Sequence, residues 1–111
     1  MSEFNFLKNS IMKQASIFFD KDKYFNDKPM ADYLMEFLVD QKVIGATVFR
    51  GEAGFGENQQ IKRPGQLFSF DEPPMVITFV DNDERVTKAL TALRKKVKSG
   101  FIVVSQVEIW K

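Results

Sequence analysis

Helix-forming and strand-forming segments follow one another in this chain in an order that few folds accommodate. Strands are predicted where apolar residues alternate with polar ones or where β-branched and aromatic residues dominate, and helices where apolar residues recur at the helical period. The expected elements are strands at residues 11–19, 46–50, 66–80 and 101–110, and helices at 30–42 and 85–99. The order β-α-β-β-α-β predicts an α+β, ferredoxin-like fold, with two helices on one face of a four-stranded antiparallel sheet.

Start and stop signals bound these elements. Asp27 and Pro29 are expected to begin the first helix, with the aspartate as its cap and the proline in its first turn. The acids of residues 81–84 are expected to begin the second helix and Gly100 to cap its end. Prolines cannot donate to a sheet ladder, so the third strand is either one strand with a break at residues 73–74 or two short strands. The expected buried stripes are Met30, Tyr33, Leu34, Phe37 and Leu38 in the first helix, and Val86, Ala89, Leu90, Leu93 and Val97 in the second.

Two of the predicted strands are apolar on both faces. In the third strand, apolar residues occupy both alternating sets over residues 75–80, and in the second Val48 and Phe49 point to opposite faces. A sheet with one face in water should instead alternate cleanly between apolar and polar residues. We therefore infer that a second chain covers the face that lacks helices. The alternative is a monomer with a few exposed apolar side chains, which is common.

Composition excludes several classes of function. The chain has 111 residues, which fits a single domain at residues 11–111 preceded by an N-terminal extension at 1–10. It contains no cysteine and no histidine, so disulfides, thiol catalysis, Cys/His zinc sites and a Ser-His triad are absent. With a net charge of +1, no nucleic-acid partner is expected. No apolar run is long enough to span a membrane and no secretory signal begins the chain, so a cytoplasmic location is expected.

Glycines cluster directly after the second predicted strand. Gly51, Gly54 and Gly56 follow Arg50 and precede the polar run 57–66. Glycine permits positive φ and a close approach of backbone N–H groups to a ligand, and arginine beside such a turn can pair with phosphate or carboxylate. The segment is therefore a candidate hinge that binds an anionic effector. In the structural alternative, the glycines serve a bulge and a tight turn, and Arg50 pairs with a carboxylate of a neighbouring subunit.

The stretch GATVFRGEAGFG at residues 45–56, preceded by DKDKYFNDKPMADYLMEFLVDQKVI, resembles the PII-like proteins grouped as domain-of-unknown-function family one-hundred-ninety. The resemblance covers roughly residues 15–110. Members of that family are similar to the nitrogen-regulatory PII proteins and to the CutA proteins. The resemblance implies a PII-like homotrimer whose sheets face inward, which would cover the second sheet face. It also implies a non-enzymatic signalling or regulatory protein with no catalytic residues, in which a nucleotide or other anionic effector binds at clefts between subunits.

The same resemblance implies which residues form the effector site. In PII proteins a Gly-Phe-Gly motif stands at the base of a long loop, and a glutamine shortly after it helps to hold nucleotide, magnesium and 2-oxoglutarate. Here the matching loop is 57–66, and Asn58 stands at the glutamine's offset. Lys62 and Arg63 are candidates for contact with a regulated protein or transporter. The candidate effector-binding residues are Arg50, Gly51, Gly54, Phe55, Gly56, Asn58 and Gln59.

One departure from PII proteins concerns their second glycine-rich phosphate loop, between the second helix and the last strand. The chain has KKVKSGFIVV there, with a single glycine, which argues against ATP binding. Lys95, Lys96 and Lys98 could meet an anion in that place. The commoner role of lysines at the end of a helix is to balance its dipole in water.

Four rival functions are carried alongside the regulatory one. A protein-only oligomeric adaptor needs no effector. An RNA-binding module shares the β-α-β-β-α-β order, but Phe68 and Phe70 lack flanking basic residues. An enzyme would need acids with shifted pKa values, whereas acids such as Asp81 and Asp83 are expected in solvated or capping roles. A CutA-like metal role would rest on weak oxygen ligands, and no metal residues are assigned.

Overall fold

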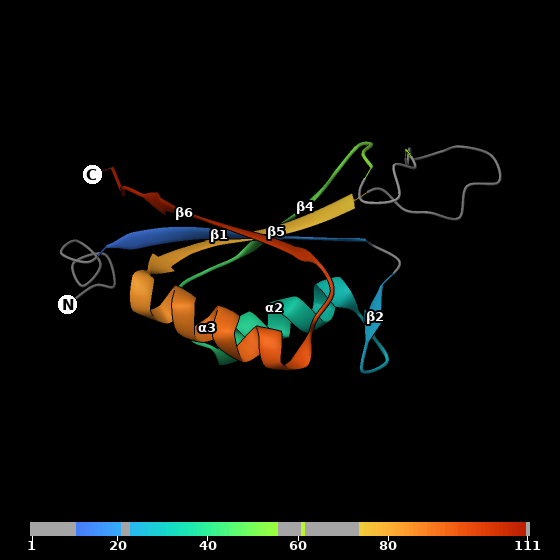
Figure 1. Ribbon diagram of the computed structural model, residues 1–111, viewed down its shortest axis with the longest axis horizontal. Coiled ribbons are helices and arrows are strands. Elements are labelled where there is room, and N and C mark those ends of the chain that lie inside the picture. Colours follow the sequence, from blue (N-terminus) through green and yellow to red (C-terminus); the bar gives the residue numbers. More distant parts are fainter. Residues whose placement is uncertain (1–10, 21–22, 56–60, 62–73, 111) are drawn as a thin grey trace.

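Four strands and two helices form a two-layer fold in the computed structural model, which describes residues 11–20, 23–55, 61 and 74–110. The sheet has the order β4-β5-β1-β6, and every neighbouring pair is antiparallel (Figure 1). Its strands are β1 (Met12–Asp20), β4 (Thr47–Arg50), β5 (Pro74–Asn82) and β6 (Phe101–Val107), and its helices are α2 (Met30–Asp40) and α3 (Asp83–Lys96). This arrangement confirms the predicted α+β, ferredoxin-like fold. The N-terminal extension at 1–10 and the predicted strand at 66–70 lie outside the described residues.

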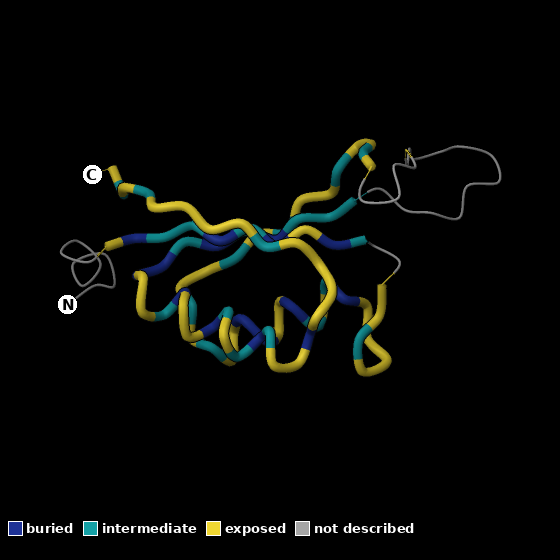
Figure 2. The backbone as a smooth tube through the Cα atoms, viewed as in Figure 1, coloured by how far each residue is buried: buried dark blue, intermediate teal, exposed yellow. Residues whose placement is uncertain are grey.

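Both helices pack on the same face of the sheet, and the core lies between the two layers (Figures 1 and 2). The sheet contributes alternate residues of its two central strands, among them Ala15, Ile17 and Ile77, to this core. The helices contribute the predicted stripes, in which only Tyr33 and Leu90 are half-buried. Each aliphatic side chain removed from water in this way stabilises the fold by about 1.5–3 kcal/mol.

A small hairpin precedes the first helix where only a polar turn was predicted. Strands β2 (Tyr24–Phe25) and β3 (Lys28–Pro29) pair across the two-residue turn Asn26–Asp27. Asn26 and Asp27 have φ values of 51° and 63°, which their short polar side chains tolerate better than most. The prediction that Asp27 caps the helix was therefore wrong, because it turns the hairpin instead. The residue directly before α2 is Pro29, with no side-chain cap.

Two side-chain contacts hold this hairpin against α2, beside the backbone hydrogen bond from the Met30 N–H to the Lys23 carbonyl at 2.8 Å. The ring of Phe25 stacks on that of Tyr33 with centroids 4.4 Å apart. The Lys28 ammonium pairs with the Glu36 carboxylate, and this hydrogen bond raises the pKa of Lys28. Because both partners of the ion pair are largely exposed, the aromatic stack is the main contact that fixes the hairpin.

Helix α3 begins as predicted but ends earlier. Its N-cap is Asn82, whose Oδ1 accepts a hydrogen bond from the Arg85 N–H at 2.8 Å. The helix ends at Lys96, not at residue 99, and Val97 is already extended. Gly100 does not cap it, because this glycine lies in the connection to β6 with a φ of 87°. The Arg94 guanidinium instead binds carbonyls of the connection that follows the helix, as described below.

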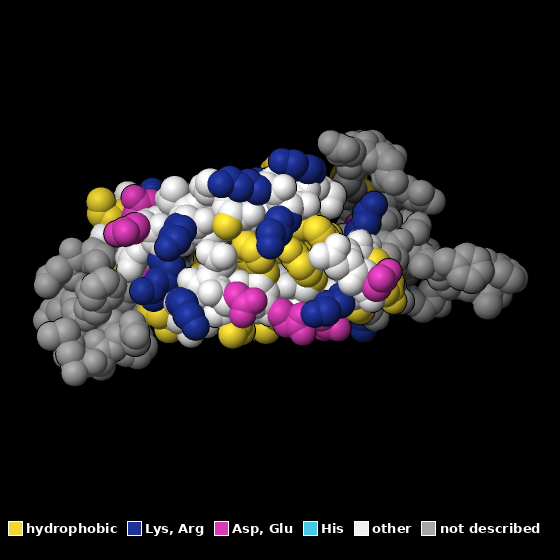
Figure 3. All heavy atoms as spheres, turned by 90° about the horizontal axis from the view of Figure 1, so that it is seen from below, with side chains coloured by type: hydrophobic (Ala, Val, Ile, Leu, Met, Phe, Trp, Pro, Cys, Tyr) yellow, Lys and Arg dark blue, Asp and Glu magenta, His cyan; other side chains and the backbone are white. Residues whose placement is uncertain are grey.

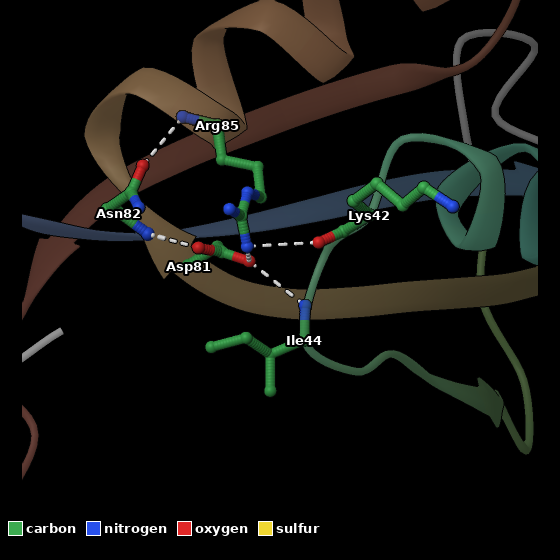
Figure 4. A network of polar contacts seen from close by, with 5 residues as sticks. All are labelled: Lys42, Ile44, Asp81, Asn82 and Arg85. Atoms are coloured by element: carbon green, nitrogen blue, oxygen red, sulfur yellow. Dashed lines mark hydrogen bonds and ion pairs between the residues drawn. The ribbon is translucent and has the colours of Figure 1, made fainter. Parts of the chain in front are cut away.

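A buried carboxylate joins the start of α3 to the connection between α2 and β4 (Figure 4). Asp81 is fully buried, and its two oxygens accept hydrogen bonds from the N–H groups of Asn82 at 2.7 Å and Ile44 at 2.9 Å. The Arg85 guanidinium lies 3.6 Å from the same carboxylate and donates to the Lys42 carbonyl at 3.0 Å. The expectation of a solvated or capping Asp81 was wrong, because its charge is satisfied from inside the fold. The network fixes the chain just before β4.

Among the residues that the structure describes, no helix lies on the other side of the sheet, and we call that side the open face. Strand register places its side chains in rows that cross the sheet, because residues paired across neighbouring strands point to the same face. The first row is Phe49, Val76, Phe18 and Phe101, the second is Thr47, Thr78, Ser16 and Val103, and the third is Val80, Gln14 and Ser105. None of these residues is charged, whereas charged side chains of both signs cover the helix layer (Figure 3). The first row confirms that apolar residues occupy the second face.

The Asp81 network can be tested with Asp81→Asn. The carboxamide presents one oxygen where two are needed, and its NH2 group would face a backbone N–H. We therefore expect the free energy of unfolding to fall by roughly 2–3 kcal/mol in urea denaturation. The matched control Asp40→Asn, on an exposed residue of α2, should change it by less than about 0.5 kcal/mol. Equal stability of the two variants would show that the network is dispensable.

Candidate functional site

The candidate site lies where β4 ends. Within β4, Val48 pairs with the core residue Ile77, so Arg50, two positions on, lies on the helix side of the sheet. Phe49 points to the opposite side and is 53% exposed on the open face. Arg50 pairs with Met75 at the rim of the sheet and is itself exposed. The arginine is thus presented at the end of the strand and is not buried in the core.

The glycines that follow Arg50 are packed against Pro74. The Gly51 N–H donates to the Pro74 carbonyl at 2.6 Å, and a Cβ at Gly51 would lie only 2.8 Å from that oxygen. A Cβ at Gly54 would lie 2.9 Å from Cγ of the Pro74 ring. Neither glycine has a positive φ. Positive φ therefore does not explain these two glycines, and the close approach of Pro74 is what requires glycine here.

Pro74 is the site residue that sequence reasoning missed. It is the first residue of β5, and its carbonyl receives the Gly51 N–H that extends the β4–β5 ladder by one step. The segment between Gly51 and Pro74 therefore leaves the sheet and returns to it at one place. The proline was recognised as a break in a strand. Its contact with glycines some twenty positions earlier has no local signal in the sequence.

The structure describes only part of the predicted effector set. It brings together Arg50, Gly51 and Gly54, and Phe55 follows them with 63% of its surface exposed. The remaining candidates, and the predicted loop 57–66 apart from Ile61, lie outside the described residues; they are Gly56, Asn58, Gln59, Lys62 and Arg63.

The connection between α3 and β6 reaches the same end of the sheet. Phe101, the first residue of β6, stands in the same row as Phe49, the neighbour of Arg50. The Arg94 guanidinium donates to the carbonyls of Val97 at 3.2 Å, Ser99 at 2.7 Å and Gly100 at 3.0 Å. The connection is therefore wrapped around a cation from its own helix, and its carbonyl groups point inward to that cation.

The basic residues beside this connection have different surroundings. Lys98 donates from Nζ to the Arg94 carbonyl at 2.6 Å, where it caps the end of α3. Lys95 and Lys96 are exposed in the last turn of the same helix. This arrangement supports the dipole-balancing role for Lys98.

Two further findings concern the part of the chain that the structure describes. No group of three or more acidic side chains is placed there to hold a metal ion. Neither α2 nor α3 combines the length and the apolar character that a membrane crossing requires.

Comparison with known proteins gives one family. Its model, DUF190, described as "Uncharacterized ACR, COG1993", matches residues 12–109. A "UPF0166 protein" of Aquifex aeolicus is 31% identical over 97 residues, which cover 87% of this chain and 91% of the relative. A UPF0166 protein of Methanocaldococcus jannaschii is 26% identical over 106 residues, covering 95% and 94% of the two chains.

Solved structures with the same fold are more distant in sequence. CPII, a nitrogen regulatory PII-like protein from Thiomonas intermedia K12, superposes with a TM-score of 0.66 at 17% identity, covering 88% of this chain and 87% of that one. That structure is bound to ADP, AMP and bicarbonate. The divalent ion tolerance protein CutA1 of Ehrlichia chaffeensis has a TM-score of 0.63 at 8% identity, covering 93% and 87%. These likenesses confirm the predicted PII-like and CutA-like fold.

The contact with Pro74 can be tested by adding a Cβ at each glycine. Gly51→Ala should destabilise the fold by about 1–3 kcal/mol, because the Cβ meets a backbone oxygen that cannot move alone. Gly54→Ala should cost less, and Pro74→Ala should relieve that cost but not the cost of Gly51→Ala. The control is Gly45→Ala, where a Cβ meets nothing within 4 Å and stability should stay the same or rise slightly. Additive effects of Gly54→Ala and Pro74→Ala in thermal unfolding would rule out their contact.

Proposed function

The chain belongs to the DUF190 family, and we propose that it is a non-enzymatic PII-like regulatory protein that binds a small anionic effector or nucleotide. The observation that carries the proposal is the end of β4. There an exposed arginine is followed by glycines whose backbone is held against Pro74 at the base of the segment that leads into the predicted loop. A guanidinium beside such a backbone turn can pair with phosphate or carboxylate oxygens. ADP, AMP and bicarbonate, bound by the CPII protein, are ligands of this chemical class.

We propose that the effector binds in clefts between copies of the chain, in a homotrimer that acts in the cytoplasm. The open face supports assembly, because Phe18, Phe49 and Phe101 expose 41%, 53% and 66% of their surfaces along one row. Covering these rings would stabilise an assembly through the hydrophobic effect. In this arrangement the segment 57–66 reports occupancy to a partner protein, with Lys62 and Arg63 as contact residues.

The residues also support a binding role over a catalytic one. General acid–base work needs a carboxylate or imidazole that can exchange protons with a substrate. The chain has no histidine, and the buried acid of the described core, Asp81, already accepts from two backbone N–H groups and faces Arg85. A protein-only adaptor remains the second candidate, because assembly through the open face requires no ligand.

An RNA-binding role has one observation in its favour and one against it. The row of phenylalanines could stack on bases, as aromatic residues do on the sheets of RNA-recognition domains. The four described strands of the sheet, however, place no lysine or arginine on the open face to meet the phosphates. Single-strand binding that weakens steeply with salt would be needed to support this function.

The proposal is tested by thermal unfolding with ADP, AMP and bicarbonate, each over a wide concentration range. A ligand present at about a hundredfold excess over its Kd stabilises the folded state by about 2.7 kcal/mol and should raise the Tm by roughly 5–10 °C. Arg50→Ala should abolish this rise because it removes the cation. Arg50→Lys should restore it only in part because lysine lacks the planar fork.

The matched control is Lys88→Ala, which removes an exposed cation from the middle of α3 and should leave the ligand effect unchanged. Light scattering of every variant reports assembly in parallel. An assembled protein that no ligand stabilises would favour the adaptor. Dissociation of Arg50→Ala would identify Arg50 as a subunit contact and not as an effector ligand.

A further inference from the structure

We propose that a cluster of hydroxyl and amide groups centred on Thr78 fixes the register in which copies of this chain pack their open faces together. The occupant of the open face is thus a second copy of the chain. The inference rests on the assembly in the proposed function and adds to it the residue that sets its geometry.

Thr78 lies at the middle of the open face. It belongs to β5, one of the two central strands, and pairs with Ser16 on β1 and Thr47 on β4. Its Oγ1 accepts hydrogen bonds from Gln14 Nε2 at 3.0 Å and from Ser16 Oγ at 3.3 Å. The row directly beside it contains Phe18, so a polar band adjoins an aromatic one.

The hydrogen bonds within this cluster leave one donor over. The hydroxyls of Ser16 and Thr78 share one hydrogen bond in which either can donate, so one of their two O–H groups remains as a donor, and among the described residues no acceptor is found for it. Water can satisfy this group in an isolated chain, because Thr78 is only half-buried. Once another surface covers the face and excludes water, the donor needs an acceptor from that surface.

The chemistry of the open face favours a copy of itself as that surface. Charged residues make up 28% of the chain, yet none stands in the three rows of the open face. Beyond these rows, Asp20 at the end of β1 is the one charged residue that the register of the four strands places on this side. A charged protein or a nucleic acid would therefore find almost no counter-charge. The polar groups present are hydroxyls and a carboxamide, which donate and accept equally well. A face built from such groups can hydrogen-bond to copies of the same face arranged around a rotation axis.

The position of the cluster then selects one register. When polar bands meet, the remaining O–H of the Ser16–Thr78 pair finds oxygen acceptors such as the hydroxyls or the Gln14 carboxamide of the neighbouring copy. When the faces slide, the same donor is buried against the aromatic row with no acceptor. A purely apolar face would lack this penalty and would pack in several ways, as coiled coils do without a polar core residue.

The test compares Thr78→Val, which keeps the shape and removes the hydroxyl, with Thr78→Ser, which keeps the hydroxyl. The matched control is Thr91→Val, on the exposed side of α3. Light scattering and analytical ultracentrifugation measure the masses over a dilution series, and circular dichroism checks folding. We expect wild type, Thr78→Ser and Thr91→Val to give one species of about three times the 12.8 kDa chain mass. Thr78→Val should give a mixture of masses, or a roughly tenfold higher concentration for half-assembly, because a buried donor is no longer matched.

A second variant guards against a loss of folding in Thr78→Val. Gln14→Met keeps the length of the side chain, removes the amide that donates to Thr78, and should also broaden the mass distribution. Uniform trimers of wild-type mass and stability in both variants would overturn the register role and leave the proposed assembly intact. A monomeric wild type would overturn both. Salt-dependent binding of single-stranded RNA that is lost in Phe18→Ala would show that the occupant is not a second copy.

Discussion

A carboxylate removed from water has to be matched by donors, and the matching of Asp81 determines how the two halves of this fold meet. Its oxygens accept hydrogen bonds from the N–H groups of Asn82, the N-cap of α3, and of Ile44, in the connection that leads into β4, and Arg85 lies beside the same carboxylate. The connection cannot shift without leaving a buried charge unsatisfied. Strand β4 therefore begins at a defined point. Because the strand is short, this point also determines where Arg50 and the glycines after it lie.

Patterns that act over a few residues predicted most of the fold. The helical stripes, the strand order and the cap region of α3 follow from periodicity and from acids at a helix start, and each of these is present. The errors came from residues with two competing uses. Asp27 suits a helix cap and a tight turn equally well, and in the structure it lies in the turn of the hairpin. Gly100 suits a cap or a bend, and Arg94 had already satisfied the carbonyls near the helix end.

The candidate site was predictable only where its signal is local. Glycine clustering and a neighbouring arginine indicated where the strand ends, and the resemblance to a family supplied the remaining candidates. The partner that makes Gly51 and Gly54 necessary is Pro74, which approaches them through strand pairing. Long-range pairing of this kind leaves no trace in a short window of sequence. The open face could be predicted in part. Strands with apolar residues on both faces indicate that the second face is also covered, but they do not indicate the band of polar residues that contains Thr78.

The contact between Gly51 and Pro74 also bears on how such a chain can change over evolution. The hydrogen bond between Gly51 and Pro74 holds the two ends of the intervening stretch together at the edge of the sheet. The entropic cost of holding two chain ends together grows slowly with the number of residues between them, by about 0.6 kcal/mol for each doubling. Insertions and deletions there are therefore nearly neutral for stability. The length of chain between Gly51 and Pro74 can therefore differ among relatives while the sheet and its helices stay the same.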